Sequence, residues 1–334
     1  AELLVTVIKA VRAAVGDFPL WARVGMYEAH REPGQRLDDA LVTIGLAIDA
    51  GLDALHVTAY AEPMVATGIT DGHTPHRPGA LLDHAAIVRS KLGAPVIAMG
   101  RVTPERAENA LAEGAADVIA MGRALIADPE LPNKLFDGQR HRVRPCAYQY
   151  KCIGSIFLNQ PVQCAVNPDA GHEAERIAPP SAVRRVLVVG GGPAGLECAR
   201  RAALRGHYVD LWEREDHLGG RLALAQLADP DLEGLLDWLV GSISDLGVFV
   251  RTGFLADADA IVAGQFDAVV WAAGASWDGG DLTGLDDLEP WLTGEDEGIV
   301  RQRVLIRGGG KAAMSLARLA ALRTHDVTLV SESP

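Results

Sequence analysis

Residues 185–195 read Arg185-Val-Leu-Val-Val-Gly-Gly-Gly-Pro-Ala-Gly195, an apolar run that passes directly into a glycine-rich turn. The run predicts a buried strand, and the residues after the turn predict a helix. Glycine permits a tight turn and the close approach of a pyrophosphate, which the free N–H groups of the helix N-terminus can bind. The stretch therefore predicts a dinucleotide-binding unit, whose binding residues are Gly190, Gly192, Pro193, Ala194 and Gly195.

The sequence after this unit continues the same pattern. Residues 207–213 predict a second strand, and its terminal acid, Glu213, lies about twenty residues past the glycines, where an acid can bind ribose hydroxyls. Leu218-Gly-Gly-Arg221 and Asp267-Ala-Val-Val-Trp-Ala-Ala-Gly-Ala275 resemble loops that approach FAD in two-dinucleotide flavoproteins. The resemblance implies FAD at this site, with Gly220, Arg221, Ala273 and Gly274 as further contacts.

A second strand, turn and helix follow at residues 303–313. Gly308 and Gly310 match the first two glycines of the fingerprint, and Ala313 takes its third position, where alanine is permitted. This pattern predicts an NAD(P)H-binding subdomain. Glu332 ends the next expected strand, and an acid that binds the ribose there would favour NADH over NADPH.

The first 140 residues alternate short apolar runs with amphipathic stretches, which predicts parallel strands with crossover helices. Arginines follow or end these runs at Arg23, Arg101 and Arg123. Two successive strands that end in Gly-Arg predict a phosphate site, although a single such arginine can equally be a surface ion-pair residue. We expect strands at 20–25, 54–58, 96–100 and 118–122, and helices at about 2–14, 38–50, 80–92, 104–113 and 123–137.

Two stretches of this half resemble a known family. Ala98-Met-Gly-Arg101 and Met121-Gly-Arg-Ala-Leu-Ile-Ala-Asp-Pro-Glu-Leu-Pro132 resemble the last two strands of the old yellow enzyme barrel. The similarity is to the branch of 2,4-dienoyl-CoA reductase and trimethylamine dehydrogenase, and it covers essentially the whole chain. It implies the C-terminal half of a TIM (β/α)8 barrel, a cysteine segment and a Rossmann-like FAD/NAD(P)-binding domain. FMN would be held by Gly100, Arg101, Gly122 and Arg123 at its phosphate and by Arg23 near its pyrimidine edge.

The loop after the second expected strand, residues 60–76, would face this flavin. Tyr60 is our candidate proton donor to a reduced substrate, because a positioned tyrosine hydroxyl can act as a general acid. A Gly-, Thr-, Pro- and His-containing loop can also be a solvated lid. The loop does not match either named relative closely, so it does not indicate a substrate.

Three of the four cysteines, Cys146, Cys152 and Cys164, lie close together in the sequence. Such grouping favours a metal or cluster site over a disulfide framework. The family resemblance implies that they are three of four 4Fe–4S ligands, with Gln149 in place of the second. Because an amide is a poor iron ligand, a 4Fe–4S cluster with a labile iron, a 3Fe–4S cluster, zinc or three buried thiols remain open.

Composition narrows the class of protein. The 334 residues are 49% hydrophobic and 22% charged, with a net charge of −13, which is typical of a globular protein of about two domains. The acidic balance argues against nucleic acid and anionic membranes as partners. No apolar run approaches the roughly 18 residues of a membrane span, and no secretory signal is present, so we expect a cytoplasmic protein. The absence of an initiator Met leads us to expect an internal fragment, inactive by itself.

We therefore predict four segments. They are a half-barrel at 1–140, an iron–sulfur segment and linker at 141–180, an FAD-binding domain at 181–300 and the start of an NAD(P)-binding subdomain at 301–334. Electrons would pass between NAD(P)H, FAD, the cluster and FMN to reduce an activated C=C bond of enoate or dienoyl type. Alternatives are an amine dehydrogenase or demethylase that delivers electrons to a partner protein, and a non-catalytic nucleotide-binding protein in which Gln149 breaks the relay. Homo-oligomerisation is left open.

Overall fold

A computed structural model of the chain describes residues 1–29, 34–61, 78–175, 179–275, 288–293, 303–323 and 325–331. The chain divides into two compact units, Ala1–Leu125 and Ile126–Pro334, which we describe separately. Across the described ranges we find no helix with the length and apolar character that a membrane crossing requires.

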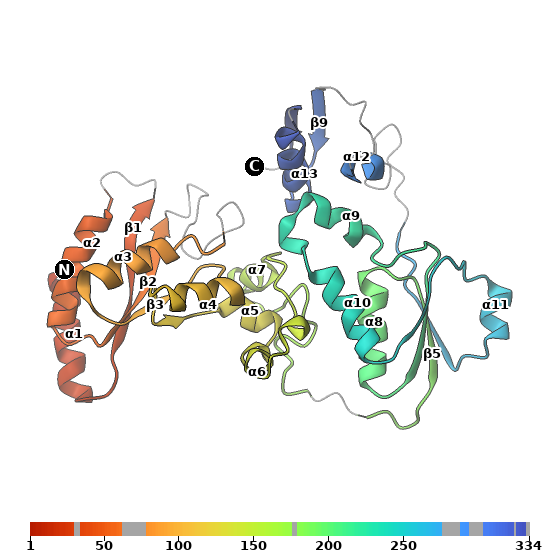
Figure 1. Ribbon diagram of the computed structural model, residues 1–334, viewed down its shortest axis with the longest axis horizontal. Coiled ribbons are helices and arrows are strands. Elements are labelled where there is room, and N and C mark those ends of the chain that lie inside the picture. Colours follow the sequence, from red (N-terminus) through yellow and green to blue (C-terminus); the bar gives the residue numbers. More distant parts are fainter. Residues whose placement is uncertain are drawn as a thin grey trace. The chain divides into compact units, whose positions relative to one another are not determined.

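The first unit is a parallel sheet with helices between its strands, in the order β1-β2-β3-β4 (Figure 1). Consecutive strands are therefore neighbours, as in the repeated strand–helix units of a (β/α) barrel. The elements are α1 (Glu2–Val15), β1 (Trp21–Ala29), α2 (Leu37–Asp49), β2 (Ala54–Ala61), α3 (Leu82–Leu92), β3 (Val96–Ala98), α4 (Pro104–Ala112), β4 (Val118–Ile119) and α5 (Gly122–Ala127).

The core of this unit lies between the sheet and its helices. Alternate residues of β2, Leu55 and Val57, are fully buried and belong to one apolar cluster with Ile44 of α2 and Val88 of α3. Because side chains alternate along a strand, the residues between them, such as His56, face the opposite side of the sheet. The helices thus cover one face, and the other face carries the polar side chains described below.

The second unit is built around a parallel sheet in the order β7-β6-β5-β8. Helices α8 and α10 lie on one face of this sheet and α11 on the other (Figure 1). Val186 and Val188 of the central strand pack with α8 and α10, whereas Leu187 packs with α11 on the other face. The elements are α6 (Leu131–Phe136), η2 (Arg140–Arg142), α7 (Lys151–Phe157), β5 (Arg185–Val189), α8 (Pro193–Leu204), β6 (Tyr208–Trp212), α9 (Arg221–Ala228), η3 (Pro230–Leu232), α10 (Leu235–Asp245), β7 (Phe249–Arg251), α11 (Ala258–Ala263) and β8 (Ala268–Trp271).

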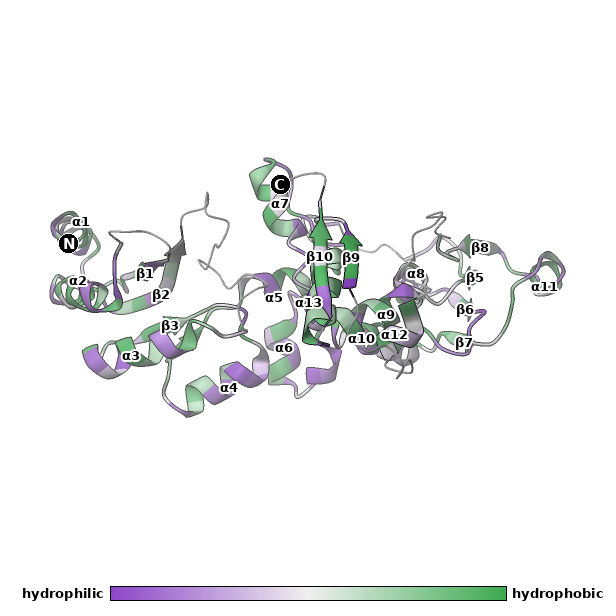
Figure 2. Cartoon of the chain, turned by 90° about the horizontal axis from the view of Figure 1, so that it is seen from above, coloured by the Kyte–Doolittle hydropathy of each residue, from purple (hydrophilic) through white to green (hydrophobic). Residues whose placement is uncertain are grey.

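The chain ends in a separate two-stranded parallel sheet. Strands β9 (Arg303–Arg307) and β10 (Asp326–Val330) pair in register and flank helix α13 (Lys311–Leu322) in the sequence. Figure 2 shows the two strands side by side, coloured mainly as hydrophobic. The short helix α12 (Glu289–Thr293) precedes them.

Two expectations about elements were wrong in detail. A single helix at 123–137 is instead α5 and α6, which are separated at Asp128 and Pro129. Proline lacks the N–H that would continue the helix, and the buried Asp128 carboxylate accepts the backbone N–H of Glu130. The strand expected at 20–25 extends to Ala29, so Arg23 lies inside β1 rather than at its end.

Candidate flavin and nucleotide sites

The turn between β5 and α8 requires glycine at two positions. Gly190 has φ +109°, and a Cβ there would lie 2.3 Å from the carbonyl oxygen of Ala272. A Cβ on Gly195 would lie 1.9 Å from the carbonyl oxygen of Gly190. Any side chain would thus push apart the helix N-terminus and the strands β5 and β8. This close approach is what a dinucleotide turn needs, and the residues fit such a ligand.

Two other predicted contact segments lie against the same turn. The backbone N–H of Gly219 donates to the carbonyl of Gly191 at 2.9 Å. A Cβ on Gly220 would be 3.2 Å from Cα of Gly192. Ala273 also adjoins the turn, because its Cα would be 3.0 Å from a Cβ on Gly190. Arg221 begins α9 directly after this contact, and Gly274 follows Ala273 with φ +78°.

The predicted ribose-binding acid also faces the glycine turn. Glu213 follows β6, and its Oε2 accepts the N–H of Gly191 at 2.5 Å. Its Oε1 accepts the N–H of Glu215 at 2.9 Å. The carboxylate is thereby fixed beside the turn, and its ribose-binding role stays a prediction. Pro193 and Ala194 form the first turn of α8, as expected.

The second glycine turn has a looser steric requirement. Gly308 has φ +139°, and a Cβ there would meet that of Ala313 at 3.3 Å, whereas a Cβ on Gly310 would meet nothing within 4 Å. The residue that follows, Lys311, begins α13 and directs its ammonium away from solvent into a cluster of oxygens. Glu332 lies outside the described residues.

In the first unit, the two Gly-Arg pairs that are predicted to contact a phosphate follow neighbouring strands. Gly100 and Arg101 come after β3, and Gly122 and Arg123 open α5 after β4. Since β3 and β4 pair in parallel, both loops lie at the same end of the sheet. Arg101 is only 7% exposed and has φ +54°, a conformation that costs a non-glycine residue about 1 to 3 kcal/mol. Two guanidinium groups and a positive-φ glycine at one sheet end fit a phosphate.

Arg23 lies within strand β1 and not in a loop at the end of the sheet. It pairs with His56 of β2, and its Nη2 donates to Oγ1 of Thr58 at 3.2 Å. Burial lowers the pKa of His56, and the positive charge of Arg23 lowers it further. The backbone of Tyr60 belongs to the end of β2, but its side chain and residues 62–77 lie outside the described part of the chain, so its catalytic role stays a prediction.

The cysteine segment does not present a finished metal site. Cys146 and Cys164 are half-buried, Cys152 is buried on α7, and among the described residues none of the three forms a disulfide. Within the described ranges, no three Cys, His, Asp or Glu side chains lie where they could hold a metal ion. The Gln149 amide donates to the carbonyl of Ala147 at 3.1 Å. These residues therefore do not fit a four-thiolate cluster, and we route no electron step through one.

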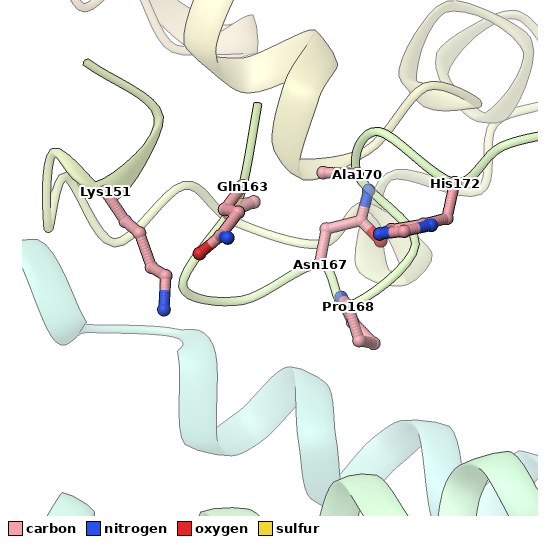
Figure 3. Close-up of a pocket in the computed structure, with 7 residues that line it drawn as sticks. Lys151, Gln163, Asn167, Pro168, Ala170 and His172 are labelled. Carbon is pink, nitrogen blue, oxygen red and sulfur yellow. The ribbon is translucent and has the colours of Figure 1, made fainter. Parts of the chain in front are cut away.

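A shallow cavity of about 200 Å³ opens beside Cys164 (Figure 3). Its wall is mostly polar and is formed by α7 and by the segment that follows it. The lining residues are Lys151, Gln163, Cys164, Asn167, Pro168, Ala170 and His172.

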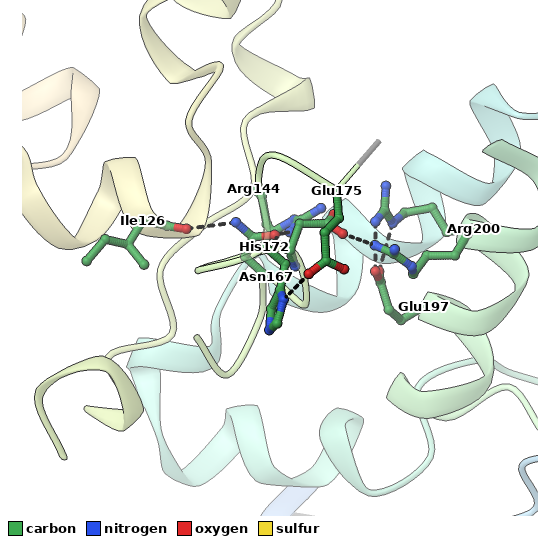
Figure 4. Close-up of polar contacts among 9 residues, drawn as sticks. Ile126, Arg144, Asn167, His172, Glu175, Glu197 and Arg200 are labelled. Carbon is green, nitrogen blue, oxygen red and sulfur yellow. Dashed lines mark hydrogen bonds and ion pairs between the residues drawn. The ribbon is translucent and has the colours of Figure 1, made fainter. Parts of the chain in front are cut away.

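A network around a buried arginine anchors the cysteine segment. Sequence patterns did not reveal this network. Arg144, two residues before Cys146, donates from Nη1 to Oδ1 of Asn167 at 2.7 Å (Figure 4). Its guanidinium also stacks 4.6 Å from the ring centre of Trp238 on α10. Burial, followed by the charge of Arg200, lowers the pKa of Arg144. The only local signal was an arginine at the start of the expected iron–sulfur segment.

Two segments of the chain match known protein families. Residues 1–142 match the NADH:flavin oxidoreductase / NADH oxidase family, and residues 188–242 match the NAD(P)-binding Rossmann-like domain. Residues 1–142 are thus part of a domain of the NADH:flavin oxidoreductase / NADH oxidase family. The predicted family and its parallel α/β architecture, a barrel domain followed by a Rossmann-like domain, are thereby confirmed.

Similar NADH:flavin oxidoreductases are about twice as long. The chain is 37% identical to a metal reductase of Desulforamulus reducens over 334 residues, which cover 94% of this chain and 48% of the relative. It is 33% identical to a cinnamate reductase of Clostridium sporogenes over 324 residues, 93% of this chain and 47% of the relative. The solved structure of a 2-naphthoyl-CoA reductase complex superposes with a TM-score of 0.87 at 28% identity, covering 98% of this chain and 51% of that one. The chain thus spans about half the length of these relatives.

Proposed function

We propose that the protein is a flavin-dependent oxidoreductase that uses NAD(P)H to reduce an activated C=C bond in a small molecule. The observation that carries this proposal is the glycine cradle at Gly190 and Gly195, which occurs in the same chain as the NADH:flavin oxidoreductase match. The names of the cinnamate and naphthoyl-CoA reductases support an unsaturated acid or thioester as the substrate class.

In this proposal each unit holds one flavin. Flavins supply hydride transfer to and from carbon when they are bound. In the second unit the glycine turn and Glu213 would bind the adenine half of FAD. In the first unit Arg101 and Arg123 would bind the FMN phosphate, and Arg23 would stabilise negative charge on the reduced ring. Tyr60 remains the proposed proton donor, and Gly308 and Gly310 the proposed NAD(P)H turn.

The other predicted assignments stay proposals. We keep the segment boundaries near residues 140, 180 and 300, and we keep Cys146, Cys152 and Cys164 as candidate ligands of an iron–sulfur site. The cytoplasm stays the proposed location, because the grouping of three cysteines in the sequence favours a metal or cluster site over a disulfide framework. A protein electron acceptor would be needed only if the enzyme worked in the oxidative direction.

Anaerobic kinetics test the proposed reaction. NADH oxidation by the flavin-loaded full-length protein that contains this chain should depend on an added enoate, for which cinnamate is the probe. Tyr60→Phe should slow cinnamate reduction and leave the reduction of flavin by NADH unchanged. Bleaching of flavin by dimethylglycine but not by NADH would instead support the amine dehydrogenase alternative. A protein that binds nucleotide but shows neither reaction would be non-catalytic.

A further inference from the structure

The ammonium of Lys311 is held by four oxygen atoms from two parts of the second unit. Its Nζ lies 3.0 Å from a carboxylate oxygen of Asp229 and 3.2 Å from one of Asp231, at the α9–η3 corner. It also lies 3.3 Å from the carbonyl oxygens of both Ala147 and Tyr148, in the loop between Cys146 and Cys152. We refer to these four oxygens as the Lys311 cage.

The cage is built for an ammonium ion. The side chains of Lys311, Asp229 and Asp231 are 22%, 9% and 12% exposed, so the charges are largely withdrawn from water. Such charges are tolerated only when they are paired and hydrogen-bonded. Lysine offers three donors around a compact charge, whereas the planar fork of arginine suits carboxylates in one plane.

The backbone of the cysteine loop is shaped for this contact. Tyr148 adopts a left-handed conformation with φ +46°, and Tyr150 does so with φ +55°. Consecutive carbonyls point in opposite directions along an extended chain, but a helical conformation at Tyr148 lets two of them face one cation. A left-handed non-glycine residue costs about 1 to 3 kcal/mol and persists only where its surroundings hold it. The Lys311 ammonium is one group that does so.

Lys311 is also the first residue of α13, directly after the Gly308–Gly310 turn. We propose that Lys311 is a positioning residue that fixes the loop between Cys146 and Cys152 and links it to nucleotide binding at this turn. The linkage, though not the fixing of the loop, rests on the proposed NAD(P)H site. A pyrophosphate at the turn attracts the ammonium away from the two carbonyls, so bound NADH loosens the loop. By reciprocity, a tightly held loop weakens NADH binding by the same factor.

Four variants separate positioning from simple stabilisation. Lys311→Met removes the cation that pairs with two buried carboxylates and lowers global stability. The triple variant K311M/D229N/D231N removes the whole charge cluster and recovers that stability, and asparagine retains the capping oxygen of Asp229. Lys311→Arg keeps the positive charge, but its planar guanidinium does not match the arrangement of the four oxygens. Lys151→Met is the matched control, because it removes an exposed lysine beside Cys152 and leaves the cage intact.

Amide hydrogen exchange of residues 147–152, measured without nucleotide, tests the fixing of the loop. We expect exchange at least about fivefold faster than wild type in the triple variant and in Lys311→Arg, and unchanged exchange in Lys151→Met. Urea unfolding of the same proteins shows whether global stability has been recovered. Wild-type exchange in a stable triple variant would overturn the positioning role.

The same exchange experiment with saturating NADH tests the linkage, with binding measured separately by calorimetry. Bound NADH should speed loop exchange in the wild type and leave the triple variant unaffected. Equal effects in both proteins, or no effect in a wild type that binds NADH, would overturn the linkage. A wild type that does not bind NADH would refute the proposed second nucleotide site and the linkage with it, and the exchange data without nucleotide would still decide the fixing of the loop.

Discussion

Replacing Gly195 by alanine should destabilise the second unit and abolish its nucleotide binding. The added Cβ would lie 1.9 Å from the carbonyl oxygen of Gly190, whereas Cβ contacts below 3.0 Å essentially never occur. Helix α8 must therefore move by about 1 Å relative to the glycine turn, in an interior that is close-packed. Such overpacking typically costs about 1 to 3 kcal/mol, and we expect the upper end because the opposing atom is backbone.

The assay combines urea unfolding with calorimetric titration of FAD. Gly195→Ala should lower the unfolding free energy by about 2 to 3 kcal/mol and raise the FAD dissociation constant at least about a hundredfold. Gly192→Ala is the matched control, because a Cβ there meets no protein atom within 4 Å. It should preserve stability and weaken FAD alone. A Gly195→Ala protein with wild-type stability and wild-type affinity for FAD would show that position 195 does not require glycine.

Three further predictions concern buried polar groups outside the glycine turn. Arg144→Lys keeps a charge but loses the planar stack on Trp238, and should lower the unfolding free energy by about 1 to 2 kcal/mol in urea. Asp128→Ala leaves the buried N–H of Arg144 without its 2.7 Å acceptor and should cost about 1 to 3 kcal/mol, whereas an unchanged melting curve would contradict that role. Burial lowers the pKa of both His56 and His84, so the unfolded chain binds more protons. The free energy of unfolding should therefore fall as pH drops below about 6.5, by up to about 1.4 kcal/mol per pH unit for each histidine. A His56→Gln/His84→Gln protein should show a shallower fall.

The elements with strong local signals could be predicted from the sequence. Strand β5 has the expected bounds, because an unbroken run of branched apolar residues leads into consecutive glycines, which favour a turn. The strand expected before Glu332 is likewise present as β10, Asp326–Val330. The single helix at 123–137 was a misreading of a signal that was present, since Pro129 within the run marks a helix boundary.

The contacts that join distant segments could not be predicted in this way. Lys311 reaches a loop more than 160 positions earlier in the chain, and nothing in its neighbourhood distinguishes it from a solvent-exposed lysine. Arg144 lies at the start of the expected iron–sulfur segment, where the sequence drew attention to the cysteines and not to the arginine. Both are buried charges whose partners come from elsewhere in the fold, and local periodicity carries no information about such pairs.

The flavin content of the protein, followed by its response to NADH, tests the central claim most directly. The protein is purified without oxygen, its FMN and FAD are measured per chain, and NADH is added while the flavin spectrum is recorded. We expect one FAD per chain, and NADH should bleach it. The Gly195→Ala variant should be purified without FAD. Protein without an adenine dinucleotide, or with FAD that NADH does not reduce, would contradict it.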